Sequence, residues 1–196
     1  MRQVYWLGGG SGAGKSTTAA RLAARHGLTV YATDDTMADH ATRTTPDDAP
    51  YLHRFLAMDM DERWLRRSPR EMVETFHWFR GEGFGLILDD LERMSGRIIV
   101  EGFRLLPRLV APLAGNAVWL LPTPRFREAA FAKRGVDIPG WTSDPERTLA
   151  NLLERDRLFT EHLAGETRRL GLTGIDVDLG VGEDELADRV SAALDL

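Results

Sequence analysis

The chain has 196 residues, of which 43% are hydrophobic and 28% charged, a composition typical of a globular protein with a single core, so we expect one domain over residues 1–196. Its 25 basic and 30 acidic residues give a net charge of −5, which argues against a nucleic-acid partner, and the absence of cysteine excludes disulfides and thiolate metal sites. Neither a signal peptide nor an apolar run of about 20 residues, the length that crosses a bilayer, is recognisable, so we expect a cytoplasmic location and no membrane partner.

A phosphate-binding loop stands near the start of the chain. Residues 8–17 read GGGSGAGKST and, counted from Gly9, fit the pattern G-x-x-x-x-G-K-[ST]. An apolar run over 4–7 predicts a strand before the loop, and an Ala-rich stretch over 16–25 predicts a helix after it. Glycines let backbone N–H groups face phosphate oxygens, and the helix dipole adds to the same anion site. The predicted nucleotide-binding residues are Gly9, Gly10, Ser11, Gly12, Ala13, Gly14, Lys15, Ser16 and Thr17.

Two side chains of this loop have predicted chemical roles. Lys15 should reach the β- and γ-phosphates as a catalytic cation, and the Ser16 hydroxyl should ligate Mg²⁺. ATP and Mg²⁺ are therefore the expected cofactors, and ATP is favoured over GTP because no N-K-x-D motif is present. An ordinary Gly-rich turn is the alternative, which the flanking strand and helix disfavour.

Two aspartates follow the second predicted strand. Residues 28–33 are β-branched and mostly apolar, and the strand that they predict ends in Asp34 and Asp35. In open α/β sheets, ligands lie beyond the carboxyl ends of the strands, so this pair is expected near the loop. A carboxylate there could accept the proton of an attacking hydroxyl, with Asp35 the favoured catalytic base and substrate contact and Asp34 the second candidate. A helix N-cap is the alternative, and both roles can coexist.

A helical insert is predicted over residues 37–95. It contains a turn-rich loop at 42–48, a patchy helical pattern over 51–67, a helix over 69–80 and another over 84–94. An insert at this place would be a lid over the acceptor. Side chains that could touch the acceptor, although core packing or solvent exposure is the more ordinary role of each, are His53, Arg63, Trp64, Arg66, Arg67 and Trp78.

An acid ends the third predicted strand, over residues 97–102. Three consecutive β-branched residues predict a strand that is buried on both faces, and Glu101 at its end is expected to orient Mg²⁺ or a water ligand of Mg²⁺. A strand-end charge that faces solvent is the alternative. Gly102 is expected to let the substrate approach the backbone, and Arg104 to be available for an anionic group.

A basic segment follows the fourth predicted strand, over residues 116–121. Residues 124–142 are Arg-rich and are expected to form a lid, with a hinge in the loop that follows the helix. Arg127 and Arg134 would share one helix face and are the predicted catalytic arginines, while Arg125 is expected to contact the nucleotide. A solvated surface helix is the alternative.

A long helix is predicted from Ser143 to about residue 169, because Ser-Asp-Pro-Glu is a strong helix start. Arg155 could reach back to the nucleotide phosphates, or residues 155–157 could form a self-paired surface run, and the sequence favours neither. A strand over 174–178 and a helix over 183–194 complete the chain.

This order of parts resembles the nucleoside-monophosphate-kinase-like small kinases, and within them the small-molecule hydroxyl kinases such as shikimate kinase, gluconate kinase and chloramphenicol phosphotransferase. The resemblance covers the whole chain in layout, although the loop is its one specific motif. It implies an α/β P-loop fold with three layers, in which helices flank a five-stranded parallel sheet of order 2-3-1-4-5. It also implies that the carboxylate after the second strand contacts the acceptor hydroxyl and that lid arginines close over ATP. The Gly-Gly-Gly that shikimate kinases carry after the third strand is replaced by Gly102-Phe103-Arg104.

These observations predict a phosphotransferase that binds a nucleoside triphosphate and transfers the γ-phosphate to a hydroxyl of a small molecule. A nucleoside or nucleotide kinase is one alternative, and it would need base-recognising groups in the insert. A nucleotide-dependent regulatory ATPase that has no small-molecule acceptor is the other.

Overall fold

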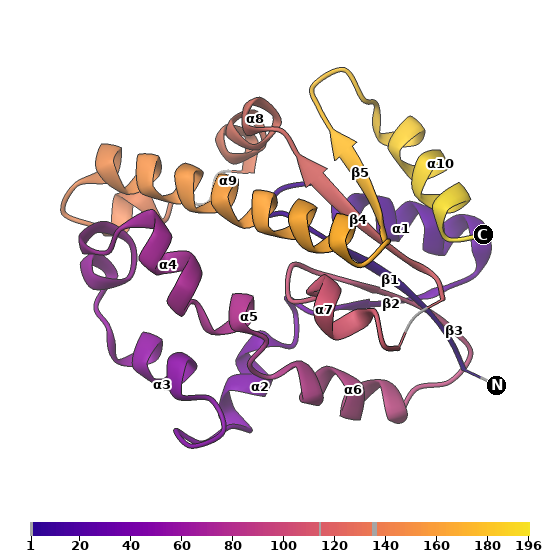
Figure 1. The fold of residues 1–196 in the computed structure, drawn as a ribbon, viewed down its shortest axis with the longest axis horizontal. Coiled ribbons are helices and arrows are strands. Elements are labelled where there is room, and N and C mark those ends of the chain that lie inside the picture. Colours follow the sequence, from indigo (N-terminus) through magenta and orange to yellow (C-terminus); the bar gives the residue numbers. More distant parts are fainter. Residues whose placement is uncertain (1, 114, 135–136) are drawn as a thin grey trace.

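Five parallel strands form one sheet in the computed structural model of the chain (Figure 1). The structure describes residues 2–113, 115–134 and 137–196, with the side chain of residue 134 outside this description. The strands lie in the order β2-β3-β1-β4-β5, so the predicted three-layer α/β fold and its strand order are confirmed. Their bounds are β1 Gln3–Gly9, β2 Thr29–Ala32, β3 Arg97–Glu101, β4 Ala117–Pro122 and β5 Thr173–Val177.

Both faces of the sheet are buried, which explains the apolar runs of the central strands. Tyr5 and Leu7 of β1 face helices α1 (Lys15–His26) and α10 (Glu183–Ala193), whereas Trp6 belongs to the core on the opposite face. That second core is covered by the long helix α9 (Pro145–Arg169), which crosses the sheet in Figure 1. The period-2 alternation of side chains therefore divides each strand between two hydrophobic clusters.

The strand register brings three chain segments to one edge of the sheet. Leu7 of β1 pairs with Glu101 of β3, and Ala32 of β2 pairs with the same residue. Because the strands are parallel, the segments that follow β1, β2 and β3 leave the sheet side by side. The phosphate-binding loop, the Asp34–Asp35 pair and Glu101 meet there for this reason.

The predicted insert consists of short helices between β2 and β3. Phe55, Trp64 and Phe76 form its aromatic centre, and Phe79 stacks on Phe159 of α9 with ring centroids 3.7 Å apart. Its elements are α2 Met37–Thr42, α3 Pro50–Ala57, a π-helical turn η1 Glu62–Arg66, α4 Pro69–Thr75, α5 His77–Arg80 and α6 Phe84–Glu92.

Two expectations for the insert need correction. The helix predicted over 69–80 is broken at Phe76, whose extended backbone (ψ 114°) separates α4 from α5 and directs its ring into the aromatic centre. The helical pattern over 51–67 is divided into α3 and the π-turn η1. Ser68 is the N-cap of α4, as expected, and accepts a hydrogen bond from the backbone N–H of Glu71.

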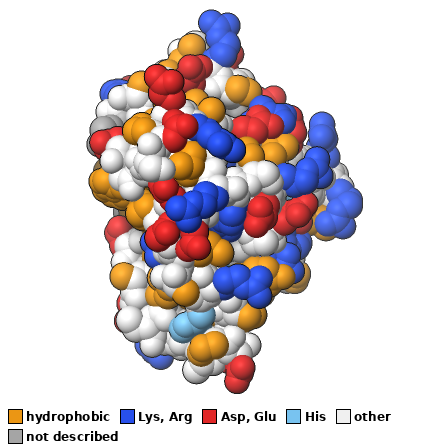
Figure 2. Space-filling view, turned by 90° about the vertical axis from the view of Figure 1, so that its left-hand side faces the viewer, with side chains coloured by type: hydrophobic (Ala, Val, Ile, Leu, Met, Phe, Trp, Pro, Cys, Tyr) orange, Lys and Arg blue, Asp and Glu red, His pale blue; other side chains and the backbone are white. Residues whose placement is uncertain are grey.

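The remaining helices flank β4 and lead into α9. Asp144 caps α9 by accepting a hydrogen bond from the backbone N–H of Arg147. These helices are α7 Pro107–Val110, α8 Pro124–Arg134 and the 3₁₀ turn η2 Pro139–Trp141. Among the described residues, no helix combines the length and the apolar character that a membrane span needs. Acidic and basic side chains are interspersed on the face of the molecule shown in Figure 2.

Candidate active site

The phosphate-binding loop is wound in the way its glycines predict. Gly9, Gly12 and Gly14 have φ values of 136°, 74° and 85°, which favour glycine over residues that carry a Cβ. At Gly9 a Cβ would also lie 2.3 Å from the carbonyl oxygen of Leu120 in β4. Nζ of Lys15 donates a hydrogen bond to the carbonyl oxygen of Gly10 at 2.8 Å, which holds the ammonium group over the loop.

Glu101 lies within the electrostatic reach of four predicted site residues. The glutamate is 3% exposed, and burial raises the pKa of its carboxyl group above the ordinary value. Lys15 and a hydrogen bond from the Ser16 hydroxyl act in the opposite direction on this pKa, whereas the charges of Asp34 and Asp35 raise it further. Lys15, Ser16, Asp34, Asp35 and Glu101 therefore form one cluster at the carboxyl edge of the sheet.

The donor set of this cluster suits Mg²⁺. Mg²⁺ prefers oxygen ligands, keeps several of its waters and binds through one or two carboxylates together with substrate phosphates. Ser16 and Glu101 supply a hydroxyl and a carboxylate beside the phosphate-binding loop. In the part of the chain that the structure describes, no group of three or more His, Cys, Asp and Glu forms a metal site by itself. Such a pair fits a metal ion that a nucleotide brings with it.

Asp34 and Asp35 lie exposed immediately after β2. The backbone N–H of Thr33 donates to the carbonyl oxygen of Glu101, which ties the start of this segment to β3. The N-cap position of α2 is occupied by Thr36, so neither aspartate has the capping position that was the alternative role. Both carboxylates remain at the edge of the cluster around Glu101.

Gly102 and Arg104 occupy the junction between the sheet and the insert. A Cβ on Gly102 would lie 1.7 Å from Oγ1 of Thr33, so this glycine accommodates a protein side chain. Arg104 is 2% exposed and donates to the carbonyl oxygens of Thr33 and Gly83 and to Nδ1 of His40, while burial lowers its pKa to about 10. The expectation of an Arg104 that is available to an anionic group therefore does not match its geometry, because its terminal amino groups already hold the insert on the sheet.

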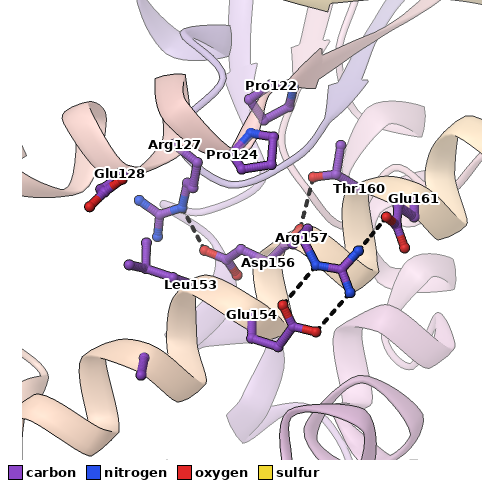
Figure 3. A pocket seen from close by; sticks show the side chains of 11 residues that line it. Pro122, Pro124, Arg127, Glu128, Leu153, Glu154, Asp156, Arg157, Thr160 and Glu161 are labelled. Carbon is purple, nitrogen blue, oxygen red and sulfur yellow. Dashed lines mark hydrogen bonds and ion pairs between the residues drawn. The ribbon is translucent and has the colours of Figure 1, made fainter.

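Two of the predicted arginines bind the same buried carboxylate, and one of them lies against the loop. Arg127 of α8 lies against the phosphate-binding loop, since a Cβ on Gly12 would be 3.3 Å from its Nη1. Its Nε donates to Asp156 at 2.6 Å (Figure 3). Arg155 donates to the other oxygen of the same carboxylate. Arg125 is exposed on α8, on the side of Asp178. The side chain of Arg134, the other predicted catalytic arginine, lies outside the described residues.

The run over 155–157 is paired internally only in part, and that part is buried. Arg155 and Asp156 are paired with each other and buried, at 8% and 1% exposure, so the pair is not a surface run. Arg157 instead pairs with Glu154 and Glu161 on the more exposed side of α9. The spacing of Asp156 with Leu152, Phe159 and Leu163, which places it on the buried stripe of α9, is the sequence signal that could have identified it.

A cavity of about 260 Å³ borders the loop on the side of α1 and α8. Polar and charged groups in its lining come from Thr17, Thr18, Lys133 and Glu183, and the rest of the lining is largely apolar. The sequence analysis did not identify its apolar walls, which come from segments far apart in the chain, namely Phe126, Ala129, Ala130, Leu179, Val181 and Leu186. A flat apolar ring with polar edges, such as a nucleobase, is the kind of group that such a cavity can hold.

A phosphate-binding loop after the central strand, an acid at the end of the neighbouring strand and an arginine of α8 against the loop are parts that a P-loop kinase combines. The comparisons with known proteins support this class. No protein-family model matches the chain. Adenylate kinases from two strains of Thermus thermophilus are 30% identical to it over 203 aligned positions, which cover 95% of this chain and 94% of theirs.

Solved kinase structures share the fold over nearly the whole chain. Shikimate kinase from Acinetobacter baumannii superposes with a TM-score of 0.54 at 14% identity, covering 100% of this chain and 94% of that one. Deoxyadenosine kinase from M. mycoides gives 0.53 at 12% identity, with coverages of 99% and 100%. A gluconokinase from Sinorhizobium meliloti gives 0.51 at 14% identity, with coverages of 98% and 91%. The chain belongs to the adenylate-kinase-type, nucleoside-monophosphate-kinase-like family of P-loop kinases, and it is a phosphotransferase.

Proposed function

We propose that the protein transfers the γ-phosphoryl group of MgATP to a hydroxyl group of a small molecule. The observation that carries this proposal is the cluster of Lys15, Ser16, Asp34, Asp35 and Glu101 at one edge of the sheet. It combines a triphosphate site with carboxylates that have no capping role in α2. A hydroxyl acceptor needs a proton acceptor beside the phosphate site, and these carboxylates can supply one.

The donor half of the reaction uses the loop and its neighbours. Lys15 and the loop amides hold the β- and γ-phosphates, and the cavity beside Thr17 and Phe126 takes the nucleobase. Ser16, together with Glu101 through water, would hold Mg²⁺, which neutralises phosphate charge when it is bound. Arg127 and Arg155 stabilise negative charge on the transferring group.

The acceptor half uses the aspartates after β2. Asp35 orients the acceptor hydroxyl and takes its proton while the acceptor oxygen forms a bond to the γ-phosphorus. The bond between that phosphorus and the bridging oxygen breaks, and ADP leaves with the electron pair. Asp34 can replace Asp35 as the proton acceptor. Such a site acts by positioning and electrostatics.

A nucleotide acceptor is the second candidate, because adenylate kinases are 30% identical to the chain over most of its length. A phosphate acceptor would bring a second anion next to Asp34 and Asp35, and it would need cations that are free to bind it. Arg104, the arginine that follows β3, is 2% exposed and engaged with Thr33, His40 and Gly83. This engagement is why we rank a hydroxyl acceptor first.

A panel of acceptors tests the proposal. ³¹P NMR of the protein with MgATP and pools of sugars, polyols, hydroxy acids, nucleosides and nucleoside monophosphates should reveal a phosphate ester of a hydroxyl compound. The double variant Asp34→Asn with Asp35→Asn should lose about 10²–10⁴-fold in transfer rate, the range that general-base catalysis contributes. Conversion of nucleoside monophosphates alone would establish the second candidate. Slow hydrolysis without any phosphorylated product would favour a regulatory ATPase.

A further inference from the structure

Asp156 is a buried carboxylate on the apolar stripe of α9. It is 1% exposed, and Leu152 and Phe159, which lie four residues before it and three after it, are also 1% exposed. A charged group at such a position costs several kcal/mol unless partners compensate it. An apolar residue would be the simple choice here if packing were the only requirement. The groups that bind this carboxylate must therefore explain why a charged residue occupies the position.

The two oxygens of this carboxylate are divided between two arginines. Oδ2 accepts a hydrogen bond from Nε of Arg127 at 2.6 Å. Oδ1 accepts from Nε and Nη2 of Arg155 at 2.9 and 2.6 Å. Figure 3 shows Asp156 reaching from α9 toward Arg127 of α8. One side chain thus sets the relative position of two guanidinium groups that belong to different helices.

The two arginines face different parts of the molecule. Arg127 contacts the donor loop at Gly12, within 3.3 Å of where a Cβ would lie. The guanidinium of Arg155 lies 5.2 Å from the ring centroid of Trp64 and 5.9 Å from that of Phe76, both in the insert. One cation therefore belongs to the nucleotide side and the other to the insert side. Asp156 lies between them.

We propose that Asp156 is a positioning residue that aligns Arg127 and Arg155 for the γ-phosphoryl group, an inference that rests on the proposed function. It engages Arg127 through Nε, so this hydrogen bond does not occupy the terminal amino groups of that side chain. The electrostatic value of a cation in phosphoryl transfer depends on its being oriented before the reaction. The cluster of two arginines and one carboxylate also keeps a net charge of +1 beside the phosphates.

The opposite role would be a carboxylate that withholds the arginines from phosphate. The two roles predict opposite changes in ATP affinity when the carboxylate is removed. A positioning carboxylate helps the γ-phosphate to bind, so its removal weakens the binding of ATP more than that of ADP. A withholding carboxylate repels the γ-phosphate, so its removal strengthens the binding of ATP.

The test compares MgATP and MgADP affinities by calorimetry for the wild type and for Asp156→Asn, which keeps the volume and removes the charge. We expect the preference for ATP over ADP to fall about tenfold, as loss of one well-placed charged hydrogen bond implies, while ADP affinity changes less than about twofold. Glu161→Gln is the matched control, because it makes the same chemical change in the exposed pair with Arg157 on the same helix. It should leave both affinities unchanged.

Asp156→Glu covers the case in which the Asn variant does not fold, because it keeps the charge and displaces it by one methylene. Circular dichroism establishes folding, and the ATP preference of the folded Glu variant should fall at least about threefold. An unchanged preference in a folded variant, an increase in Asp156→Asn, or a wild type that does not favour ATP over ADP would each overturn the proposal. These measurements need no acceptor. If the wild type transfers phosphate to nothing in the panel, the proposed function fails while the role of Asp156 is still decided.

Discussion

Gly102 follows the end of β3, where its backbone lies very close to the side chain of Thr33. Its φ of 150° lies in a region that favours glycine, and a Cβ there would lie 1.7 Å from Oγ1 of Thr33. Thr33 is 0% exposed and cannot simply rotate into solvent. The contact keeps the segment that carries Asp34 and Asp35 close to Glu101.

We expect Gly102→Ala to lower the free energy of unfolding by at least about 2 kcal/mol, because strain and overlap add at this position. Urea denaturation would measure the change. Gly165→Ala in α9 is the matched control, since nothing lies within 4 Å of its Cβ position, and it should raise stability by about 0.5–1 kcal/mol. Equal effects of the two substitutions would contradict the role of the close contact.

His77 is a titratable side chain inside the aromatic centre of the insert. It is 0% exposed, and its ring lies 4.2 Å from that of Trp78 and 4.7 Å from that of Phe76, measured between centroids. Within the described residues, neither ring nitrogen has a hydrogen-bond partner. Burial, followed by the charges of Arg104 and Arg67, lowers the pKa of His77 to about 3.

This shift predicts a loss of stability in mild acid. His77 takes up a proton below a pKa of about 6.5 in the unfolded chain but only near 3 in the folded protein. The contribution of this difference to the free energy of unfolding is therefore lost as the pH falls from about 6.5 to about 3. At pH 5 the free energy of unfolding should be roughly 2 kcal/mol lower than at pH 8 for this reason. His77→Leu should remove that part of the pH dependence in denaturation experiments.

Phe55→Leu is the control for this experiment, because Phe55 contacts the ring of His77 at 5.1 Å but does not titrate. We expect it to lower stability by similar amounts at pH 5 and pH 8. A His77→Leu variant with the same pH dependence as the wild type would show that the histidine is not buried in its neutral form.

At the scale of elements, the π-turn η1 docks the insert on α9. Nδ2 of Asn151 donates to the carbonyl oxygens of Trp64 and Leu65 at 3.2 and 3.1 Å. Asp61, just before the turn, accepts from the backbone N–H and the hydroxyl of Ser143 at 2.8 and 2.5 Å, and these hydrogen bonds lower its pKa. A π-turn leaves carbonyl groups without their usual helical partners, and α9 supplies the donor.

Asn151→Ala should therefore cost about 1–3 kcal/mol of stability, because it leaves carbonyl groups of the turn unpaired. Hydrogen exchange followed by mass spectrometry should show a larger increase in amide exchange rate in residues 59–76 than in the rest of the chain, since the insert loses its contact with α9. Glu161→Ala, an exposed substitution on the same helix, should change stability by less than about 0.5 kcal/mol. Uniform acceleration over the whole chain would contradict a local docking role.

For the whole molecule, the cluster predicts that nucleotide and metal stabilise the fold together. MgATP at 100 times its dissociation constant should stabilise the protein by about 2.7 kcal/mol, which is roughly 5–10 °C in Tm for a chain of this size. Because Ser16 and Glu101 are expected to hold the metal, EDTA should reduce this shift. Differential scanning fluorimetry measures both effects.

Lys15→Met should abolish most of the MgATP-dependent shift, measured from the Tm of the ligand-free variant. Lys15 is 7% exposed and donates a hydrogen bond to the carbonyl oxygen of Gly10. A full shift in this variant would mean that the nucleotide binds somewhere other than the loop.

The sequence alone determined the fold class, the strand order that the family resemblance implies, and the identity of the phosphate-binding loop. These follow from local patterns, namely strand and helix periodicity and a motif whose glycines and lysine lie within one short segment. It also predicted that Glu101 and the Asp34–Asp35 pair lie near this loop, because the carboxyl ends of parallel strands meet at one edge of the sheet.

Only the tertiary structure decided which charged groups are in contact. Asp156 and Arg127 are 29 residues apart, and Arg104 binds Thr33 at a separation of 71 residues. No pattern in sequence encodes such contacts, because they depend on how helices pack over the sheet and on which charges burial forces to pair. The same packing uses Arg104 to hold the insert on the sheet and brings Arg127 and Arg155 to the same buried carboxylate, Asp156.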